Sequence, residues 1–485
     1  MEISKKIARL IYPHFRFGES KVEDAIKLVK LGVGGFCLYG GSLDEVIDFI
    51  RTVRSNALNP VIFAADYENG VGQWVSGATK LPSNMAICAS GNIDFAVRKG
   101  QITAIESDAL GVDWVFAPVL DIANNHANPI VNLRAFSDEI EKIISFSKAF
   151  ISGLNSFNIL NSIKHFPGHG DTSVDSHLVL PEIRKSEEEI ENMELLPFKA
   201  VLDFADSVMV GHLKILSMDN KNPASLSKNI ITDLLREKMQ YKKIVVTDAL
   251  MMKAISNEIE SGLNAFLAGA DILLYPEDPY RLYAALMDNY NRGVITEDMV
   301  NKAIRRQDAL IAKRRAMNYK TKDISVIGCN EHKKFVYDCA IHCISWVKKN
   351  KEPLPKKIYY YETLSTKEIK GEVFVKELMK NGFEIKSEVN NSDAIVVGIF
   401  SKPKAFSGSI NMNEEEKKEI DKLILTGKKV IFISFGSPFI FDGYLKKIEA
   451  GICCFSDLEE FQKVAADAIC GISEVYGKMP VKIYD

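Results

Sequence analysis

The chain has 485 residues, of which 47% are hydrophobic and 26% are charged, and its formal net charge at pH 7 is −3. A chain of this length exceeds one ordinary domain, so we expect two domains, one of them large. The balanced mixture of charges excludes the electrostatic footprint of a protein that binds nucleic acid or adheres to anionic membranes, so we expect neither as a partner.

The chain does not open with the pattern of a signal peptide, because the short apolar run at residues 7–12 is broken by Arg9 and ends at Pro13. The sequence contains no stretch of about eighteen consecutive apolar residues, the length that a membrane-spanning helix needs. Its eight cysteines, which include the adjacent pair Cys453 and Cys454, match neither a zinc ligand set nor a secreted disulfide framework. We therefore expect an intracellular, cytoplasmic protein.

Short apolar runs alternate with longer amphipathic stretches from the N-terminus to about residue 315. The predicted strands are residues 10–13, 35–39, 61–66, 114–121, 161–166, 207–212, 244–248 and 272–275. The predicted helices include residues 44–53, 139–154, 187–202, 229–238, 252–268 and 297–315. In 139–154, apolar residues recur mostly at three- and four-residue spacing, which is typical of one buried helix face.

Eight strands that alternate with helices over about 300 residues predict an α/β fold, a (β/α)8 TIM-type barrel. An open doubly wound sheet is the competing fold, since it has the same alternation. The glycine-rich run at residues 32–35 precedes a predicted strand instead of opening a helix, so it does not supply the phosphate loop that would favour the open sheet.

Polar side chains lie at or just beyond the ends of five predicted strands. They are Asp66, Asp121, Lys164 with His165, His212 and Asp248. A single aspartate after a strand is unremarkable, because aspartate often caps the next helix. Five such positions on five strands are poorly explained by capping and match the rim where barrel enzymes carry their catalytic groups. We therefore expect a ring of carboxylates, imidazoles and an ammonium around a pocket.

The segment from Lys164 to His177 carries three of the eight histidines. Pro167, Gly168 and Gly170 exclude a regular helix there, so the segment is predicted to be a loop that carries chemistry, with a polar surface loop as the alternative. His165 and His169 are not expected to bind zinc, because a His-x-x-x-His pair needs helical geometry to converge on a metal. We expect neither a metal nor a cofactor.

Several motifs together resemble the bacterial β-N-acetylglucosaminidases of glycoside hydrolase family 3. The sharpest are Lys-His-Phe-Pro-Gly-His-Gly-Asp at 164–171 with Asp-Ser-His at 175–177, and Val-Thr-Asp-Ala-Leu at 246–250. Weaker ones are Phe-Ala-Pro-Val-Leu-Asp at 116–121, Arg-Ala-Phe at 134–136, Val-Gly-His at 210–212 and Pro-Ala-Ser-Leu-Ser at 223–227. The resemblance covers most of residues 30–270. The Asp-Ser-His element separates this branch from the family's β-glucosidases, which lack it.

The resemblance implies a retaining hydrolase in which Asp248 is the nucleophile and His177 is the general acid/base. A carboxylate at the end of a buried strand is held rigidly, as attack on an anomeric carbon requires. Asp175 is placed to accept the imidazole N–H of His177 and to stabilise its cation. The alternative for Asp175 and His177 is an Asx-type turn with an exposed histidine.

The resemblance also implies that Asp66, Arg134, Lys164 and His165 bind the hydroxyls and the acetamido group of the sugar. Asp121 and His212 are expected at the site as substrate-binding residues, with support of neighbouring side chains as the alternative for each, and His169 is similar. The family usually has Asp-Gln-Glu-Gly-Gly after the third strand, where this chain has Asp-Tyr-Glu-Asn-Gly at 66–70. Tyr67 and Asn69 are therefore expected to alter the loop beside the sugar, and with it fine specificity more than catalysis.

A new succession of predicted helices and strands begins near residue 323. Residues 331–348 are predicted to be helical, and strands at 357–361, 394–400 and 430–435 then alternate with helices at 367–380, 413–425 and 458–470. We expect a smaller, parallel α/β sandwich at 323–485, after a catalytic barrel at 1–322. It resembles the second domain of two-domain family members. No dinucleotide fingerprint supports a nucleotide-binding role, so structural support is expected.

The sequence therefore predicts an exo-acting β-N-acetylglucosaminidase whose substrate is a carbohydrate with terminal β-linked N-acetylglucosamine. Family analogy alone points to cell-wall muropeptides and their recycling in the cytoplasm. Three alternatives stay open: an N-acetylglucosaminide or glucoside phosphorylase, a β-glucosidase on the same scaffold, and a non-catalytic sugar-binding protein. The sequence does not indicate an oligomeric state.

Overall fold

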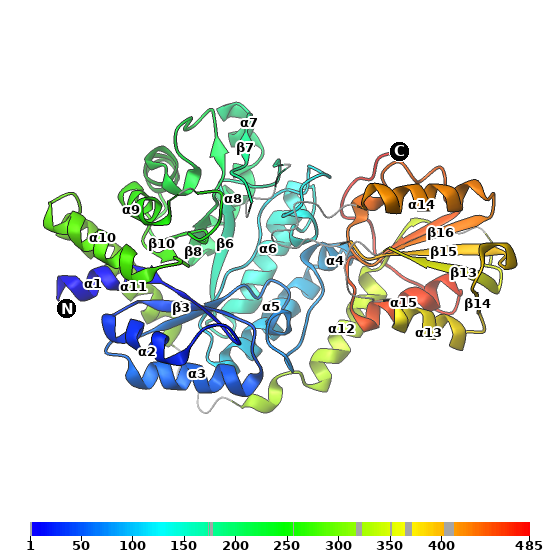
Figure 1. Ribbon diagram of the computed structural model, residues 1–485, viewed down its shortest axis with the longest axis horizontal. Coiled ribbons are helices and arrows are strands. Elements are labelled where there is room, and N and C mark those ends of the chain that lie inside the picture. The colour runs from blue at the N-terminus through cyan, green and yellow to red at the C-terminus, as the bar shows by residue number, and fades with distance from the viewer. Residues whose placement is uncertain are drawn as a thin grey trace. The chain divides into compact units, whose positions relative to one another are not determined.

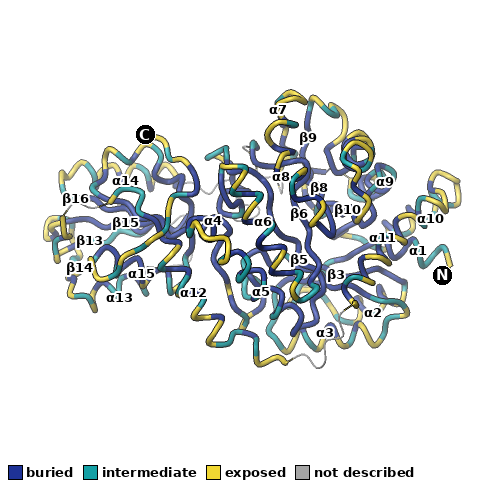
Figure 2. Tube along the Cα trace, turned by 180° about the vertical axis from the view of Figure 1, so that it is seen from behind, coloured by how far each residue is buried: buried dark blue, intermediate teal, exposed yellow. Residues whose placement is uncertain are grey.

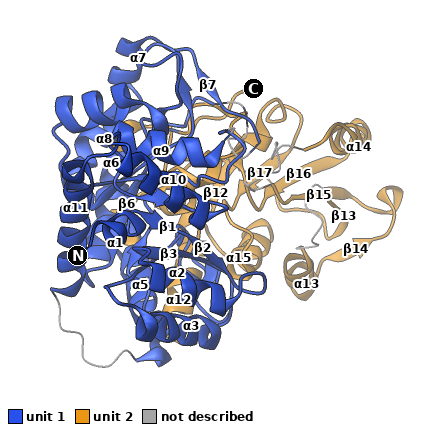
Figure 3. Cartoon of the chain, turned by 60° about the vertical axis from the view of Figure 1, so that its left-hand side comes forward, with its two compact units in different colours: residues 1–81, 96–122, 143–329 blue, residues 82–95, 123–142, 330–485 orange. Residues whose placement is uncertain are grey.

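The computed structural model describes residues 2–172, 174, 178–255, 257–316, 323–349, 352–363, 371–401 and 412–485 (Figure 1). The chain forms two compact units (Figure 3). The first comprises Met1–Leu81, Ala96–Ile122 and Ile143–Cys329, and the second comprises Pro82–Phe95, Ala123–Lys142 and Asn330–Asp485. None of the helices in the described ranges combines the length and apolar character that crossing a membrane requires.

The first unit is built around parallel strands that form a ring. They are β1 (Ile11–Tyr12), β2 (His14–Arg16), β3 (Gly35–Tyr39), β4 (Ile62–Ala65), β5 (Trp114–Val115), β6 (Leu160–Phe166), β8 (Ser207–Val210), β10 (Ile244–Thr247) and β11 (Leu273–Leu274). Seven of them pair in the order β10-β8-β6-β5-β4-β3-β2, and β1 pairs with β11. A bridge between Val246 and Ile272 joins β10 to β11, and only Pro13 separates β1 from β2.

If β1 and β2 are counted as one interrupted strand, the described residues thus form eight parallel strands with continuous pairing around the ring. The prediction of a (β/α)8 barrel is confirmed. Buried side chains fill its interior, and Tyr12 packs edge-on against Trp114 with ring centroids 6.2 Å apart. In Figure 2 the strands are almost wholly buried, whereas the surrounding helices have exposed outer faces.

Helices follow most of the strands and cover the outside of the ring. They include α2 (Val22–Leu31), α3 (Leu43–Asn56), α5 (Ile93–Leu110), α6 (Ile140–Asn155), η5 (Asn229–Lys238), α9 (Glu258–Ala268), α10 (Pro279–Asn291) and α11 (Glu297–Arg315). Their ends carry recognisable caps: Ser42 and Glu45 form a capping box at α3, and Thr296 caps α11. Gly269, with a φ of 112°, ends α9 in the left-handed conformation that favours glycine.

Three predicted elements differ in extent. Residues 187–202 form two helices, α7 (Glu187–Asn192) and α8 (Leu195–Val201), with a break at Met193 (φ −131°, ψ −78°). Pro197 stands in the first turn of α8, where a missing N–H breaks no helical hydrogen bond. The predicted strand at 114–121 is interrupted because Pro118 has no N–H to donate, and pairing resumes where Val119 bridges Lys164. Of the predicted helix at 252–268, only α9 forms.

The second unit contains a six-stranded sheet in the order β12-β17-β16-β15-β13-β14, counted over the described residues. The strands are β12 (Ser345–Lys348), β13 (Lys357–Glu362), β14 (Glu384–Lys386), β15 (Ala394–Ile399), β16 (Lys429–Ser434) and β17 (Ala450–Cys453). All neighbours pair in parallel except β12, which is antiparallel to β17. In Figure 1, α14 (Glu414–Leu425) covers one face, and α13 (Glu372–Lys380) and α15 (Glu459–Ile469) cover the other. The predicted α/β sandwich is confirmed.

One prediction in this unit is wrong: the helix expected over residues 331–348 ends at Cys343. It is α12 (Asn330–Cys343), and the β-branched and aromatic residues that follow form β12 instead. Pairing with β17 decides the matter, because Trp346 lies opposite Ile452 in that ladder. Tertiary pairing here overrides the helical pattern upstream.

Two segments from the first third of the sequence belong to the second unit. They carry α4 (Asn84–Ala89) and the 3-10 turn η2 (Asn132–Arg134). The Ser83 hydroxyl donates to the carbonyl oxygen of Phe455 at 2.9 Å, and the backbone N–H of Lys482 donates to the Asp138 carboxylate at 3.0 Å. The C-terminal residues therefore hold segments 82–95 and 123–142. A domain boundary between residues 322 and 323 stays a prediction.

Candidate active site

The polar residues predicted at the barrel rim lie where the barrel strands end. Asp66 follows β4 directly, and Asp248 follows β10 directly. Lys164 and His165 are among the last three residues of β6. His212 stands two residues beyond β8. Because all these strands run in parallel, their carboxyl ends share one end of the barrel, and the side chains gather there.

Asp66 and Lys164 form the first cluster at this rim. The ammonium of Lys164 lies 2.8 Å from Asp66 Oδ1 and 2.6 Å from Glu68 Oε1. The Tyr39 hydroxyl donates to Asp66 Oδ2 at 2.8 Å, and the indole N–H of Trp74 donates to the Asp66 carbonyl at 3.1 Å. The Lys164 side chain is 2% exposed and that of Asp66 is 25% exposed, so the carboxylate of Asp66 is the more accessible partner of this ion pair.

Tyr39 stays a neutral hydrogen-bond donor in this cluster. Burial raises the pKa of its hydroxyl well above 10, and the negative charge of Asp66 raises it further. The ring of Tyr39 also packs edge-on against Trp74, with centroids 5.0 Å apart, and the Arg16 guanidinium lies 5.0 Å from the ring centre. The orientation of the Asp66 carboxylate is thereby fixed from two sides, by Lys164 and by Tyr39.

Asp121, His165 and His169 form the second cluster. Asp121 Oδ2 lies 2.7 Å from His165 Nδ1, and its Oδ1 accepts the backbone N–H groups of His165 and His169 at 3.2 and 2.8 Å. Burial alone would raise the pKa of Asp121, but the neighbouring His165 and these hydrogen bonds lower it below its usual value. A buried carboxylate so placed sets the orientation of the His165 ring and anchors the start of the loop at 167–172.

His169 is buried beside this carboxylate. Its Nδ1 lies 2.9 Å from the Thr172 hydroxyl. Burial lowers the pKa of the imidazole from 6.5 to about 4, and the positive charge of His165 adds to this, although Asp121 and Asp248 act in the opposite sense. His169 is therefore neutral at physiological pH.

Asp248 and His212 form the third cluster. The backbone N–H of Asp248 donates to the Val210 carbonyl at 3.0 Å, and its Oδ1 accepts the N–H of Ala249 at 2.8 Å. His212 is fully buried, and its Nε2 lies 3.1 Å from the Ala249 carbonyl while its Nδ1 lies 2.6 Å from the Ser225 hydroxyl. Because the carbonyl can only accept, Nε2 carries the proton and Nδ1 accepts from Ser225. His212 thus supports the backbone that carries Asp248.

Three further predicted site residues are Arg134, Asp175 and His177. Arg134 belongs to the second unit, where it ends η2; its carbonyl accepts the side-chain amide of Asn84 at 2.8 Å, and its guanidinium donates to the Ile130 carbonyl at 3.2 Å. Asp175 and His177, the predicted general acid/base pair, lie outside the described residues. Within the described ranges, no group of three or more histidine, cysteine, aspartate or glutamate side chains could hold a metal ion.

Sequence reasoning missed Tyr39 and Trp74, and it gave Ser225 only as part of the motif at 223–227, without a role. Tyr39 ends β3 at the same rim, so the rule that picked Asp66 could have found it. Trp74 had no comparable signal, because it lies eight residues beyond Asp66 on an irregular loop. By contrast, the two departures noted after the third strand turn inward: Tyr67 is 1% exposed, and Asn69 accepts from the Lys99 ammonium at 3.4 Å. These two departures take part in loop packing.

Comparison with known proteins gives a consistent family signal. The model described as "Glycosyl hydrolase family 3 N terminal domain" matches residues 2–309. A β-hexosaminidase of Haemophilus influenzae is 34% identical over 241 residues, which cover 48% of this chain and 68% of the relative. The β-hexosaminidase A of Pseudoalteromonas piscicida is 31% identical over 274 residues, and a β-N-acetylglucosaminidase/β-glucosidase of Cellulomonas fimi is 27% identical over 343 residues. The matches cover 50% and 67% of this chain but only 46% and 61% of those two relatives.

Several solved structures resemble the chain over nearly its whole length. A glycoside hydrolase family 3 β-N-acetylglucosaminidase from Paenibacillus sp. superposes with a TM-score of 0.88 at 25% identity, covering 100% of this chain and 99% of that one. The β-glucoside phosphorylase BglX superposes with a TM-score of 0.92 at 21% identity, covering 99% and 94%. At that identity the second likeness concerns the fold alone.

Proposed function

The chain belongs to glycoside hydrolase family 3, and from this premise we propose that it is a retaining exo-β-N-acetylglucosaminidase. The observation that carries the proposal is the Asp248 carboxylate at the end of β10, on the same rim as the Asp66–Lys164 cluster. Its backbone N–H donates to the Val210 carbonyl, and its Oδ1 accepts the N–H of Ala249. A rigid carboxylate beside groups that bind hydroxyls is what cleavage of a glycosidic bond with retention requires. The likeness to a family 3 β-N-acetylglucosaminidase over the whole chain supports the choice of sugar.

In the first proposed step, an Asp248 oxygen attacks the anomeric carbon while the bond to the leaving oxygen breaks, and His177 gives that oxygen its proton. In the second step, water gives a proton to His177 and attacks the same carbon, which releases Asp248 and the free sugar with its configuration retained. The resemblance supplies the roles of His177 and of Asp175, which would stabilise the imidazolium. The hydrogen bonds that Asp248 makes with Val210 and Ala249 support its role as the nucleophile.

The sugar would be held by the partly exposed Asp66 carboxylate, with Lys164, His165 and Arg134 as further partners of its hydroxyls and acetamido group. A carboxylate suits this task because it accepts two hydrogen bonds from neighbouring hydroxyls. For Asp121 and His212 we propose support instead of sugar contact, because each is buried and bonded to the group it would orient, His165 and Ala249 respectively.

The natural substrate in this proposal is a cell-wall muropeptide fragment with a terminal N-acetylglucosamine, processed in the cytoplasm. Family analogy supports this assignment. A purified muropeptide with a terminal N-acetylglucosamine should release this sugar when it is incubated with the enzyme. Absence of release from such fragments, with activity on synthetic glycosides intact, would move the natural substrate elsewhere.

The decisive experiment compares aryl β-N-acetylglucosaminide with aryl β-glucoside, each in phosphate and in a phosphate-free buffer. We expect the first to be cleaved far faster, because a pocket that bonds an amide leaves polar groups unpaired when the amide is missing. We expect free sugar in both buffers. Comparable rates on the two glycosides would indicate the dual specificity named for the Cellulomonas fimi relative, and sugar 1-phosphate would indicate a phosphorylase. No turnover at all would leave a sugar-binding protein.

A further inference from the structure

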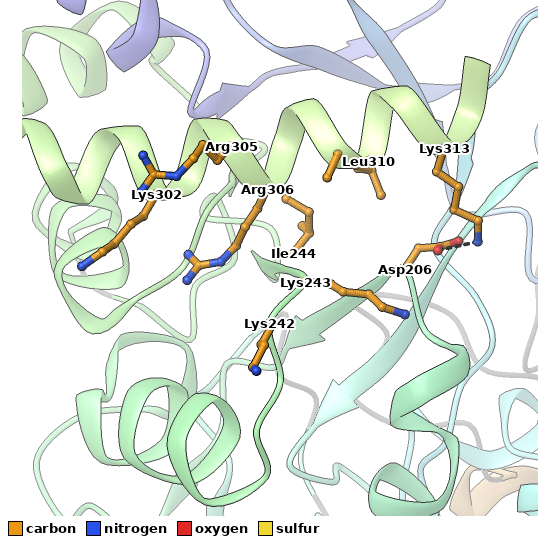
Figure 4. Close-up of a pocket in the computed structure, with 10 residues that line it drawn as sticks. Asp206, Lys242, Lys243, Ile244, Lys302, Arg305, Arg306, Leu310 and Lys313 are labelled. Atoms are coloured by element: carbon orange, nitrogen blue, oxygen red, sulfur yellow. Dashed lines mark hydrogen bonds and ion pairs between the residues drawn. The ribbon is translucent and has the colours of Figure 1, made fainter. Parts of the chain in front are cut away.

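A cavity lies at the end of the barrel where the strands begin, opposite the candidate active site. Its volume is about 750 Å³. It is lined by Asp206, Lys242, Lys243, Ile244, Lys302, Arg305, Arg306, Ala309, Leu310 and Lys313. Asp206 immediately precedes β8 and Lys243 immediately precedes β10, so the strand starts form one wall and α11 forms the other. In Figure 4, Lys313 points from α11 to Asp206, and a dashed line joins the two side chains.

The lining is strongly cationic. Six of its ten residues are lysine or arginine, against one carboxylate. Three of the cations have a carboxylate partner: Lys313 is 2.6 Å from Asp206, Arg306 is 2.8 Å from Asp271, and Lys302 is 2.6 Å from Asp298. The surplus of positive charge therefore resides on the other three, Lys242, Lys243 and Arg305.

These three cations are not neutralised by an ion pair. The Lys243 ammonium donates to the carbonyl oxygens of Asp203 and Ala205 at 2.9 and 2.7 Å, which are neutral acceptors. Among the described residues, neither Lys242 nor Arg305 has a hydrogen bond or ion pair through its side chain, and Arg305 shares the field of Asp298 with Lys302. Three positive groups that line one cavity and form no ion pair of their own within the described ranges attract a multivalent anion.

The pKa of Lys243 also reflects these surroundings. Burial lowers the pKa of its ammonium, and the positive charge of Lys313 lowers it further, although Asp206 acts in the opposite sense. An anion next to Lys243 would relieve this penalty, because an opposite charge favours the charged form.

The wall between the cations is apolar. Ile244 and Leu310 are almost fully buried, and Ala309 lies beside Leu310 on α11. A cavity of about 750 Å³ falls in the range that small organic ligands fill, and it is far larger than an inorganic ion needs. The combination fits a molecule with an apolar or ring-shaped body and several negative charges.

We propose that this cavity binds a small organic polyphosphate, with its phosphates against Lys242, Lys243 and Arg305 and its body against Ile244 and Leu310. Phosphate suits the site because an arginine guanidinium donates two parallel hydrogen bonds to it and lysine adds point charges. The site lies at the other end of the barrel from the candidate active site, so the inference does not rest on the proposed glycosidase activity.

The test is calorimetric titration of the full chain with adenosine 5′-triphosphate and with inorganic pyrophosphate at constant ionic strength. We expect saturable binding at one site, with the nucleotide bound more tightly than pyrophosphate because only the nucleotide reaches the apolar wall. The double variant K242E/R305E should lose affinity by tenfold or more, since two charge-assisted contacts become repulsions. A milder variant, K242Q/R305Q, should lose less.

The matched control is K221E/K228E, which makes the same change in net charge at two exposed lysines away from the cavity. It should bind the nucleotide as the parent does, and all variants should keep the parent's melting temperature within a few degrees. Equal affinity in the cavity and control variants, or no saturable binding, would overturn the proposal. So would binding of heparin or anionic vesicles without binding of the small probes, because the cations would then form an open surface for a macromolecule.

Discussion

His212 Nε2 lies 3.1 Å from the carbonyl oxygen of Ala249, the residue that follows Asp248. His212 is fully buried and its other ring nitrogen is bonded to Ser225, so its contact with the site runs through the backbone beside the proposed nucleophile. His212 is therefore proposed to position the nucleophile and not to touch the sugar. Loss of a positioning residue lowers kcat, whereas loss of a sugar contact raises KM.

We expect His212→Ala to lower kcat by about 10- to 100-fold with little change in KM, because a small displacement of a reacting group is enough for such a loss. The unpaired Ala249 carbonyl should also cost about 1–3 kcal/mol of stability. His212→Gln keeps a donor near that carbonyl and should recover part of the rate. A rise in KM at constant kcat would instead mean that His212 contacts the sugar.

Asp248→Ala should abolish turnover of every glycoside while the melting temperature stays close to that of the parent, since it removes the atom that forms the covalent intermediate. A slowly hydrolysed fluorinated sugar should label Asp248, as read by peptide mass spectrometry. Asp233→Ala, at an exposed aspartate on η5, is the matched control and should remain fully active. Labelling of any other carboxylate would refute the assignment.

Lys164→Met should be strongly destabilising, by about 3–5 kcal/mol, because it leaves the carboxylates of Asp66 and Glu68 close together without their shared cation. The double variant K164M/E68Q removes one of the two charges and should regain part of the lost stability. Its KM should still be raised at least tenfold, since the proposed sugar-binding ammonium is absent. Denaturant midpoints and steady-state kinetics on the same preparations separate the two effects.

Stability restored together with a normal KM would show that Lys164 serves the fold alone. A double variant no more stable than Lys164→Met would show that repulsion between the two carboxylates is not what Lys164 relieves.

The barrel strands are predictable from the sequence because each is a short apolar run that is buried on both faces, and their polar ends follow from the direction of the chain. The interruption at Pro118 and the strand at 345–348 are harder to predict from the sequence. The first depends on a single missing N–H, and the second depends on a partner, β17, about a hundred residues further along the chain. Pairing across such distances has no local signature.

The same distinction holds at the candidate site. Strand ends identify Asp66, Asp121 and Asp248 as rim residues. The structure has Asp66 and Asp248 directly after strands, and Asp121 beside His165 near the end of β6. What each side chain touches is set by tertiary packing: Asp121 meets His165 from 44 positions away, and Tyr39 reaches Asp66 from another strand. A sequence pattern can therefore gather the polar residues of a rim, but it does not sort those that face a ligand from those that orient their neighbours.

The lowered pKa of His169 predicts that the folded protein loses stability in acid. Its pKa is lowered from 6.5 to about 4 in the folded protein, so between these values the unfolded chain binds a proton that the folded one does not. The stabilising contribution is complete above pH 6.5 and is lost as the pH falls towards 4, to a total on the order of 3 kcal/mol. His169→Asn removes this dependence, so its denaturant midpoint should fall less between pH 7.5 and 4.5 than that of the parent.

His342→Gln, at an exposed histidine of α12, is the control and should follow the parent at both pH values. His14, whose pKa burial also lowers to about 4, keeps part of the acid sensitivity in all three proteins. Equal falls in the parent and in His169→Asn would place the acid-sensitive group elsewhere.

The role proposed for His177 depends on how strongly the leaving group needs a proton. Against a natural sugar alkoxide, His177→Ala should lose about 10²- to 10⁴-fold in rate, the usual contribution of general acid–base catalysis. A nitrophenolate departs without protonation, so formation of the glycosyl-enzyme from an aryl glycoside should be much less affected. Its hydrolysis should then limit turnover, because the base for the incoming water is missing.

Burst kinetics with a series of aryl glycosides measure the two steps separately in His177→Ala. We expect the first step to depend steeply on the acidity of the leaving group and to be nearly normal for the best one. Asp175→Ala should show a milder form of the same defect, because it leaves the imidazole in place but removes the carboxylate proposed to stabilise its cation. If His177→Ala forms the glycosyl-enzyme equally slowly from good and poor leaving groups, the proton comes from another residue and His177 has only a structural role in its loop.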